Sequence, residues 1–172
     1  MKKNVLILGL VAFFSLSARA GLLVDPYIGY GSYGTTADLA DAEFSGKGFT
    51  ALGSRLGYSF LLVSAGIDYE MDTFSDGKRT NMSAFVGVDL PILLRFWAEY
   101  TFNSDLEFDD LNSNIDIAFK NGQSFGIGFT GLPLLSINLE IETAKYALEA
   151  SGGDIDLDWA SYLLSVSFPL DF

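Results

Sequence analysis

Apolar residues alternate with small or polar residues along almost the whole chain after residue 20. In one segment, Leu94, Phe96 and Ala98 alternate with Arg95, Trp97 and Glu99. A period of two places successive side chains on opposite faces of a β-strand, and no helical period is visible after the N-terminal segment. The alternation predicts eight strands, near residues 27–33, 51–60, 63–72, 83–90, 94–103, 124–130, 136–143 and 160–172.

The connections between these segments alternate between short and long. Three are tight and apolar, at 59–64, 89–94 and 131–136, and two of these contain Leu-Pro. The other four are polar, Gly-rich and mostly longer, at 35–48, 74–79, 103–122 and 149–158. Short turns at one end and long loops at the other are typical of an outer-membrane barrel. We therefore predict an all-β fold, an eight-stranded antiparallel up-and-down transmembrane β-barrel.

A secreted, lipocalin-like barrel would also alternate, but with its apolar face inward. The polar face here is mostly Gly, Ser and Ala, which suits the narrow lumen of eight strands better than a solvated exterior. The apolar face is bulky and almost free of charge, with Lys145 an exception expected near the loop-side interface. Its aromatic residues fall near the strand ends, as the girdles of a membrane barrel do: Tyr58, Phe60, Phe96 and Phe168 near the turns, and Tyr69 and Phe102 near the loops.

The N-terminus has the pattern of a bacterial secretory signal peptide. Two lysines precede an apolar run from Val5 to about Leu16, and Ala18-Arg19-Ala20 forms an A-x-A cleavage site. We expect residues 1–20 to be cleaved and residues 21–172 to form one barrel domain. No Cys follows the cleavage site, so we expect no lipid anchor and no disulfide.

The C-terminal segment "LLSVSFPLDF" places five apolar residues on one strand face, Leu164, Val166, Phe168, Leu170 and Phe172. We expect this strand to close the barrel against residues 23–34, with Pro169 at a lumen-facing or weakly paired position. A terminal aromatic residue after alternating apolar residues resembles the C-terminal assembly signal of bacterial outer-membrane barrels.

The whole chain after residue 20 resembles the OmpA/OmpX-like small barrels, and it ends before the periplasmic peptidoglycan-binding domain of OmpA itself. The resemblance implies recognition by the barrel-assembly machinery, the outer membrane of a Gram-negative bacterium as the location, and both termini in the periplasm.

The predicted lumen face carries both signs of charge. We expect a lumen charge network of Arg55, Arg95, Asp68, Asp89, Glu99 and Glu140, with Glu70, Asp72 and Glu142 on the same face. Arginine–carboxylate pairs that satisfy one another would plug so narrow a barrel. The alternative is a narrow cation-preferring channel, in which the excess carboxylates line a wet path for ions or small solutes.

The chain has no His and no Cys, which excludes Ser-His-Asp and Cys-His nucleophilic sites and soft metal sites. We expect no catalytic residue, cofactor or metal site, and no enzyme activity. Acidic residues cluster at 105–116 and 154–158, but without the spacing of an EF-hand. We interpret both clusters as solvated acidic surface.

The chain has 10 basic and 22 acidic residues, and removal of the signal peptide leaves 7 basic residues and a net charge of −15. Nucleic acid is therefore excluded as a partner. Lys47, Lys78, Arg79 and Lys120 fall in loop positions from which they could reach lipopolysaccharide phosphates.

Three aromatic residues fall in the expected loops, where they either anchor a partner or fold the loops onto themselves: Phe44, Phe108 and Phe119. Residues 115–119 also alternate, so they could extend the third long hairpin as a strand whose free edge can pair with a strand of a partner. These features favour a monomeric structural or surface-interaction protein, serving envelope integrity or adhesion, over a channel.

Overall fold

The computed structural model describes residues 20–36, 47–108, 116–132, 134–150 and 153–172. Almost all of these residues belong to strands, as the alternation predicts. The strands are β1 (Ala20–Thr36), β2 (Lys47–Phe60), β3 (Val63–Phe74), β4 (Gly77–Leu90), β5 (Leu94–Phe108), β6 (Asp116–Leu132), β7 (Leu135–Ala150), β8 (Gly153–Ser167) and β9 (Leu170–Asp171). β9 continues β8 beyond a break at Phe168-Pro169, so the wall has eight strands.

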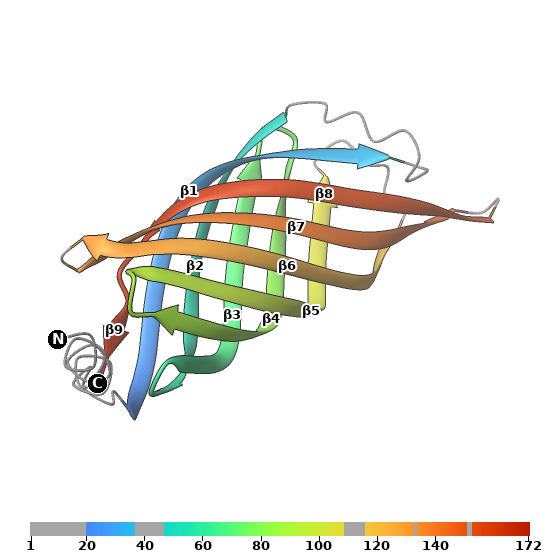
Figure 1. Ribbon diagram of the computed structural model, residues 1–172. Coiled ribbons are helices and arrows are strands. Elements are labelled where there is room, and N and C mark those ends of the chain that lie inside the picture. The colour runs from blue at the N-terminus through green and yellow to red at the C-terminus, as the bar shows by residue number, and fades with distance from the viewer. Residues whose placement is uncertain (1–19, 37–46, 109–115, 133, 151–152) are drawn as a thin grey trace, which may run out of the picture.

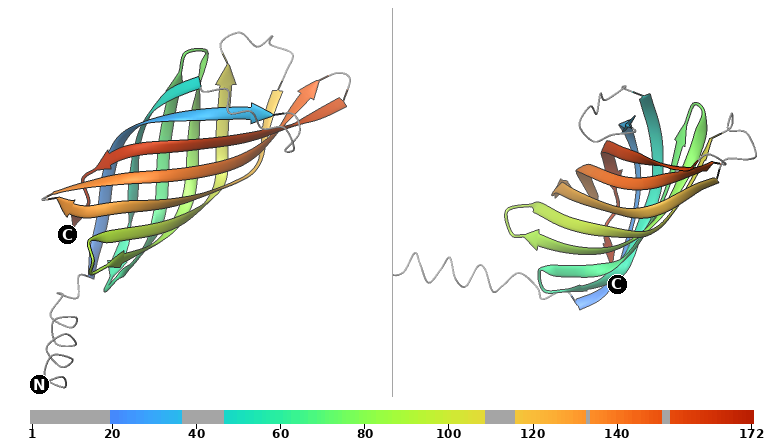
Figure 2. Two further views of the ribbon diagram at one scale, coloured as in Figure 1. Left: turned by 45° about the horizontal axis from the view of Figure 1, so that its top comes forward. Right: turned by 90° about the vertical axis from the view of Figure 1, so that its right-hand side faces the viewer.

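Each strand pairs in antiparallel fashion with its neighbour in the chain, and β1 pairs with both β2 and β8. The ladder therefore closes into an up-and-down barrel, which confirms the predicted fold (Figure 1). Figure 2 shows the barrel from two further sides. No helix in the described part of the chain is long and apolar enough to cross a membrane.

One end of the barrel, called here the turn end, carries Ala20, Phe172 and the connections β2–β3, β4–β5 and β6–β7. The opposite end, called the loop end, carries the other connections. One of these is shorter than expected: between Phe74 and Gly77 there are only two residues, Ser75 and Asp76. The expectation of a loop at 74–79 is therefore wrong for all but Ser75 and Asp76, and Arg79 belongs to β4.

The wall is not evenly paired. β5 pairs with β6 from Leu94↔Phe129 to Thr101↔Gly122, and beyond that point β5 pairs with β4 while β6 pairs with β7. In Figure 1 β6, β7 and β8 lean away from β2–β5 toward the loop end. The expected strand at 115–119 is present from Asp116, but it pairs with β7 and not with β5.

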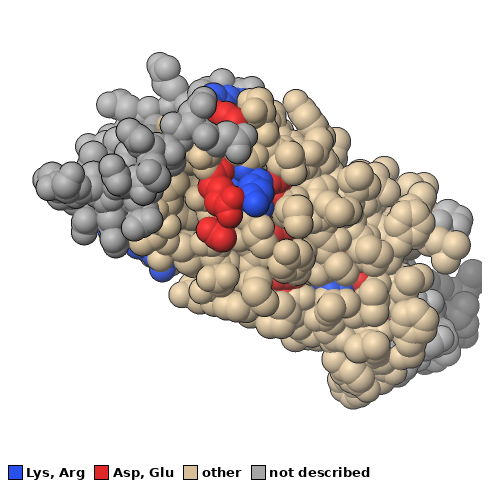
Figure 3. All heavy atoms as spheres, turned by 180° about the vertical axis from the view of Figure 1, so that it is seen from behind, with Lys and Arg blue, Asp and Glu red and all other residues tan. Residues whose placement is uncertain are grey.

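The two strand faces separate as predicted. Large apolar side chains point outward, and the six predicted girdle aromatics are all exposed on that surface. The side of the barrel in Figure 3 is accordingly mostly tan, with charged atoms visible toward one end and in a recess of the wall. The inner face is buried. We conclude that the alternation is oriented with its apolar face outward, as in a membrane barrel.

Candidate functional site

The lumen centres on Arg55, which projects from β2. Its Nε donates to Glu99 Oε1 at 3.0 Å, and its Nη2 donates to Glu140 Oε2 at 2.7 Å. Nε also lies 3.3 Å from Asp68 Oδ2. Asp68 is the direct ladder partner of Arg55 on β3, whereas Glu99 and Glu140 reach across the lumen from β5 and β7. One guanidinium therefore cross-links three strands to its own.

Two aromatic rings hold this guanidinium from either side. Its Cζ lies 4.8 Å from the centroid of the Tyr27 ring and 4.5 Å from that of Trp97. Each ring packs over a glycine directly opposite in the ladder, Gly53 for Tyr27 and Gly126 for Trp97. A Cβ at either glycine would overlap the ring. The glycines of the lumen face thus make room for the aromatic clamp on Arg55.

Arg95 continues the network toward the turn end. Its Nε donates to Asp89 Oδ1 at 2.6 Å, and its Nη1 donates to Asp25 Oδ2 at 3.0 Å. Asp25, which the sequence analysis did not single out, is 1% exposed and its Oδ2 also lies 4.0 Å from Arg55 Nη1. Asp25 therefore joins the first two arginines.

Arg79 is a second buried centre, and the expectation that it lies in an outer loop is wrong. Its side chain is fully buried. Nε and Nη2 both donate to Asp72 Oδ2, at 2.8 and 2.6 Å, and Nη2 donates to Glu142 Oε2 at 2.6 Å. Its Cζ lies 4.5 Å from the centroid of a ring of Trp159. Because the β3–β4 connection is so short, Arg79 is the third residue of β4 and faces inward.

Tyr27 links the two centres. Its hydroxyl donates to Glu70 Oε2 at 2.9 Å and lies 3.1 Å from Asp68 Oδ2, and Glu70 Oε1 lies 3.7 Å from Arg79 Nη2. The contacts therefore run without a break from Asp89 to Glu142. The network holds three arginines and eight carboxylates: Asp25, Asp68, Glu70, Asp72, Asp89, Glu99, Glu140 and Glu142.

A small cavity lies between the Arg55 and Arg79 centres. It has a volume of about 10 Å³, room for about one water molecule. Its lining is polar and acidic: Asp68, Glu70, Asn81, Ser83, Glu99, Thr101, Ser124, Glu140 and Glu142. Among the residues that the structure describes, no group of three or more acidic side chains is arranged to hold a metal ion.

An aromatic layer fills the lumen on the loop side of Arg79. Tyr33 stacks on Trp159 with ring centroids 4.2 Å apart, and Phe74 packs against both rings. Phe108 and Phe119 pack onto this cluster from β5 and β6. These two expected loop aromatics thus fold onto the barrel, while Phe44 lies outside the described residues. The sequence analysis did not predict this layer.

The predicted network residues all reach the lumen: Arg55 meets Asp68, Glu99 and Glu140, and Arg95 meets Asp89. The five residues of the expected assembly signal all lie on the outer face at the closing seam. There, Leu22 and Phe172 exchange two backbone hydrogen bonds of 3.0 Å. β1 begins at Ala20, the last residue of the expected signal peptide, and residues 1–19 lie outside the described part.

The described lysines lie on the outer surface, and each has an acidic partner. Lys47 Nζ donates to Asp76 Oδ2 at 2.8 Å, and this hydrogen bond lowers the pKa of the Asp76 carboxyl. The other pairs, at nitrogen–oxygen distances of 2.5–3.1 Å, are Lys78–Glu107, Lys120–Asp156 and Lys145–Asp158. The outer surface of the described chain therefore presents its cations already paired with carboxylates.

No protein-family model matches the chain, and no curated protein matches it. Solved structures do. The chain is similar to Ail, the attachment invasion locus protein of Yersinia pestis, in a crystal structure that also contains the heparin analogue sucrose octasulfate. The two sequences are 10% identical, the match covers 87% of this chain and 99% of that chain, and the TM-score is 0.53. It is also similar to Neisserial surface protein A (NspA), with 11% identity, 86% and 96% covered, and a TM-score of 0.54.

Both relatives are small barrels, and at this identity the likeness concerns the fold alone. The chain has the eight-stranded barrel fold of small outer-membrane proteins, in agreement with the OmpA/OmpX-like resemblance of its sequence.

Proposed function

We propose that this chain is a non-catalytic integral protein of a Gram-negative outer membrane, with a plugged lumen and a loop end that contacts surface partners. In this proposal residues 1–20 are removed on export, both termini lie in the periplasm, and the barrel is a monomer. The observation that carries the proposal is the continuous lumen network of three arginines, closed on the loop side by the aromatic layer. The small size of the cavity between the Arg55 and Arg79 centres, about 10 Å³, supports a plugged lumen.

Conductance across a planar bilayer tests the plug. Residues 21–172 are refolded in detergent, checked by a heat-dependent gel shift, and inserted into the bilayer. We expect no steady opening from the unchanged barrel, and openings when Arg55→Ala removes the central guanidinium. Lys145→Ala, which removes a cation from the outer surface, is the matched control and should stay silent. Steady openings of the unchanged barrel would contradict the plugged lumen.

A narrow cation-preferring channel is the second candidate, and one observation favours it. The lumen holds eight carboxylates against three arginines, an excess that would attract cations to any wet path. The same recording separates the two functions. Reproducible openings of the unchanged protein, with a reversal potential that favours cations, would establish the channel.

The proposed surface role is supported by free strand edges at the loop end. There β5 and β6 part beyond Thr101 and Gly122, so within the described residues each has one edge without a ladder partner. Such edges can accept an added strand from another protein. Bacteria that produce the chain should be retained on host cells or matrix more than bacteria that carry an empty vector. Equal retention would contradict the surface-interaction role.

The chemistry of the outer surface argues against a polyanionic partner. Ail was crystallised with a heparin analogue. Here residues 21–172 carry 7 basic and 22 acidic residues, a net charge of −15, and the described lysines are paired with acids. We expect the refolded barrel to pass through a heparin column. Asp158→Ala, which removes the partner of Lys145, should increase retention more than Asp105→Ala, which changes the net charge equally.

Lipid and the assembly machinery complete the expected partners. The exposed aromatic girdles suit the interfaces of an outer-membrane bilayer, with lipopolysaccharide in its outer leaflet. The outward face of Leu164, Val166, Phe168, Leu170 and Phe172 suits recognition by the barrel-assembly machinery. Phe172→Ser should reduce the amount of heat-modifiable barrel in outer membranes, whereas Phe102→Ser, an outward aromatic away from the seam, should reduce it less.

A further inference from the structure

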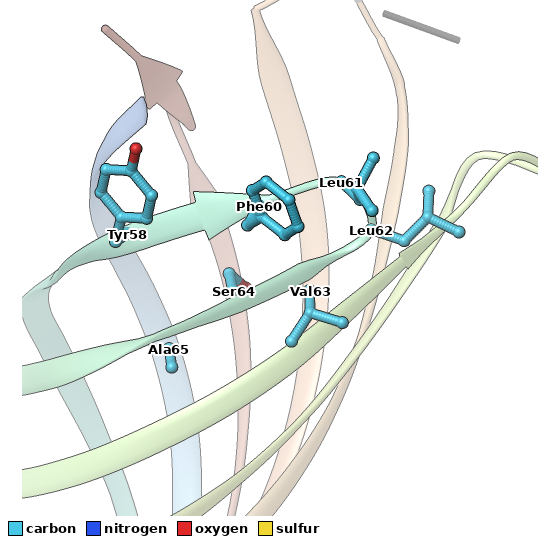
Figure 4. A pocket seen from close by; sticks show the side chains of 7 residues that line it. All are labelled: Tyr58, Phe60, Leu61, Leu62, Val63, Ser64 and Ala65. Carbon is cyan, nitrogen blue, oxygen red and sulfur yellow. The ribbon is translucent and has the colours of Figure 1, made fainter. Parts of the chain in front are cut away.

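The three connections at the turn end carry a set of exposed apolar side chains. We call this set the leucine rim, and its members are 37–73% exposed: Leu61, Leu62, Ile92, Leu93, Leu132 and Leu134. Turns that face water are usually built from Gly, Asn, Asp or Ser. The rim is instead continuous with the lipid-facing surface of the wall. Figure 4 shows this for β2–β3, where Tyr58, Phe60, Leu61 and Val63 line one apolar groove beside the turn.

The backbone of the rim repeats one unusual feature. Leu61, Leu93 and Leu134 all have positive φ, at 57°, 64° and 64°. A side chain with a Cβ is disfavoured in this left-handed region, where Gly and Asn are the common residues. In water, leucine at these positions would destabilise the folded protein in two ways, through backbone strain and through the exposure of an apolar side chain. In hydrocarbon, the favourable transfer of the side chain offsets the strain. Because leucine with positive φ occurs in all three turns, we infer that the turns lie in an apolar environment.

In two of the three turns, a backbone carbonyl has a hydrogen-bond partner within the protein. The carbonyl of Leu62 accepts a hydrogen bond of 2.7 Å from the N–H of Asp89, and the carbonyl of Leu93 accepts one of 2.8 Å from the N–H of Thr130. Each bond ties a turn to the next hairpin. Backbone groups in a bilayer must be satisfied within the protein because no water is there to do so.

The length of the apolar wall points the same way. On β3 the lipid-facing residues run from Val63 to Met71, eight residue steps. At about 3.3 Å per residue and a tilt of about 40°, these steps cover about 20 Å, whereas the apolar band of an outer-membrane barrel is about 25 Å tall. The turn residues supply the missing height.

We propose that the leucine rim is immersed in the bilayer leaflet at the turn end, where phospholipid acyl chains cover it. The proposal rests on the membrane insertion proposed above. The turn end then does not project into the aqueous phase, and the hydrocarbon boundary lies at or beyond the turns.

Fluorescence quenching by brominated lipid tests this directly. Both native tryptophans, Trp97 and Trp159, are buried inside the lumen, so the unchanged protein supplies a background that lipid-borne bromine should hardly reach. Ile92→Trp and Leu62→Trp place a reporter on the rim at positions without positive φ. Ile127→Trp reports the middle of the lipid face, and Asp76→Trp reports the water-exposed turn at the loop end. Vesicles of phosphatidylcholine with brominated acyl chains are compared with unbrominated vesicles.

We expect the rim tryptophans to lose as much emission as Ile127→Trp, and to resist iodide, which should quench Asp76→Trp. Quenching at Ile127→Trp but not on the rim, with iodide access to the rim, would overturn the proposal and leave insertion intact. No quenching at Ile127→Trp would instead overturn the insertion on which it rests.

The direction of the change in the urea midpoint of unfolding gives a second test. Asn tolerates positive φ better than Leu, so in water Leu93→Asn should raise the urea midpoint of unfolding. For an immersed rim we expect Leu93→Asn and Leu61→Asn to lower the midpoint in phosphatidylcholine vesicles. A raised midpoint in vesicles for both variants would contradict the immersed rim.

Discussion

The lumen and the outer surface both pair cations with carboxylates, but they use different cations. Within the described residues, the arginines Arg55, Arg79 and Arg95 all face the lumen and are at most 9% exposed. The lysines all face outward, with side chains 44–58% exposed. Each inner guanidinium contacts two or more carboxylates that are themselves mostly buried, whereas the lysine pairs lie at the exposed surface.

The difference follows from the geometry of the two groups. A guanidinium is planar and has five donors, so it can bridge several carboxylates and stack on aromatic rings. Arg55 does both, between Tyr27 and Trp97. An ammonium on a flexible stem suits a hydrated, loosely held pair. Buried and exposed pairs should therefore respond very differently to the same kind of substitution, and the four predictions below run from the largest effect to the smallest.

Arg55→Ala should have the largest effect. It leaves Asp68, Glu99 and Glu140 buried without their shared cation, and removal of one partner from a buried ion pair costs about 3–5 kcal/mol. The measurement is the free energy of unfolding in urea, in detergent micelles at neutral pH. Lys78→Ala is the matched control and should change it by less than about 1 kcal/mol. Equal losses for the two variants would remove the contrast between lumen and surface.

Arg79→Lys tests whether geometry or charge matters in the lumen. The positive charge is kept, but the double contact with Asp72 and the stacking on Trp159 are lost. We expect a loss of about 1.5–3 kcal/mol in the free energy of unfolding, the range for hydrogen bonds to charged groups. The reverse exchange on the surface, Lys145→Arg, should be neutral. A neutral Arg79→Lys would mean that charge alone matters at this centre.

Gly126→Val tests the aromatic clamp. The added side chain would overlap Trp97 and push its ring away from Arg55, at a cost of about 1–3 kcal/mol for overpacking. Near-ultraviolet circular dichroism should report the displaced indole. Ala84→Val adds bulk on the exposed face of β4 and should leave both the spectrum and the stability unchanged. An unaltered near-ultraviolet spectrum in Gly126→Val would contradict the displacement of the Trp97 ring.

The smallest effect concerns pH and the pair at the β3–β4 turn. The hydrogen bond from Lys47 lowers the pKa of Asp76, so the pair contributes its stability above the ordinary carboxyl pKa and loses it as the pH falls through the lowered value. In Lys47→Ala, a carboxyl titration followed by NMR should show the pKa of Asp76 rising toward its ordinary value. An unchanged Asp76 titration would rule out the ion pair in solution.

Alternation was sufficient to predict the strands and their faces because one face had to meet lipid. It also placed Arg55 and Asp68 on the lumen face, and the register then sets them directly opposite each other in the ladder. The contacts of Arg55 with Glu99 and Glu140 were not predictable as pairs. They cross the lumen, so they depend on the shear and closure of the barrel and not on any local pattern.

Arg79 was missed for a local reason. The polar composition of residues 74–79 predicts a loop there, although Asp-Gly between alternating residues is a strong signal for a tight hairpin. A two-residue turn makes Arg79 a lumen residue by parity alone. The aromatic layer around Trp159 does not follow from the sequence analysis, which describes the lumen face as mostly Gly, Ser and Ala. Glycines that receive large rings from the neighbouring strand are the signal that would have revealed it.

The seam between β1 and the end of the chain sets a condition on folding. Leu22 and Phe172 exchange two hydrogen bonds across 150 positions of sequence. Every other strand pairs with its immediate neighbour in the chain, so those contacts are local in sequence. Among the strand pairings of the described barrel, closure therefore joins the residues that lie farthest apart in sequence, and its entropic cost falls on a single late step. Until that step, β1 and β8 are both open edges that could pair with another molecule, and hairpins can accumulate without yet making a barrel.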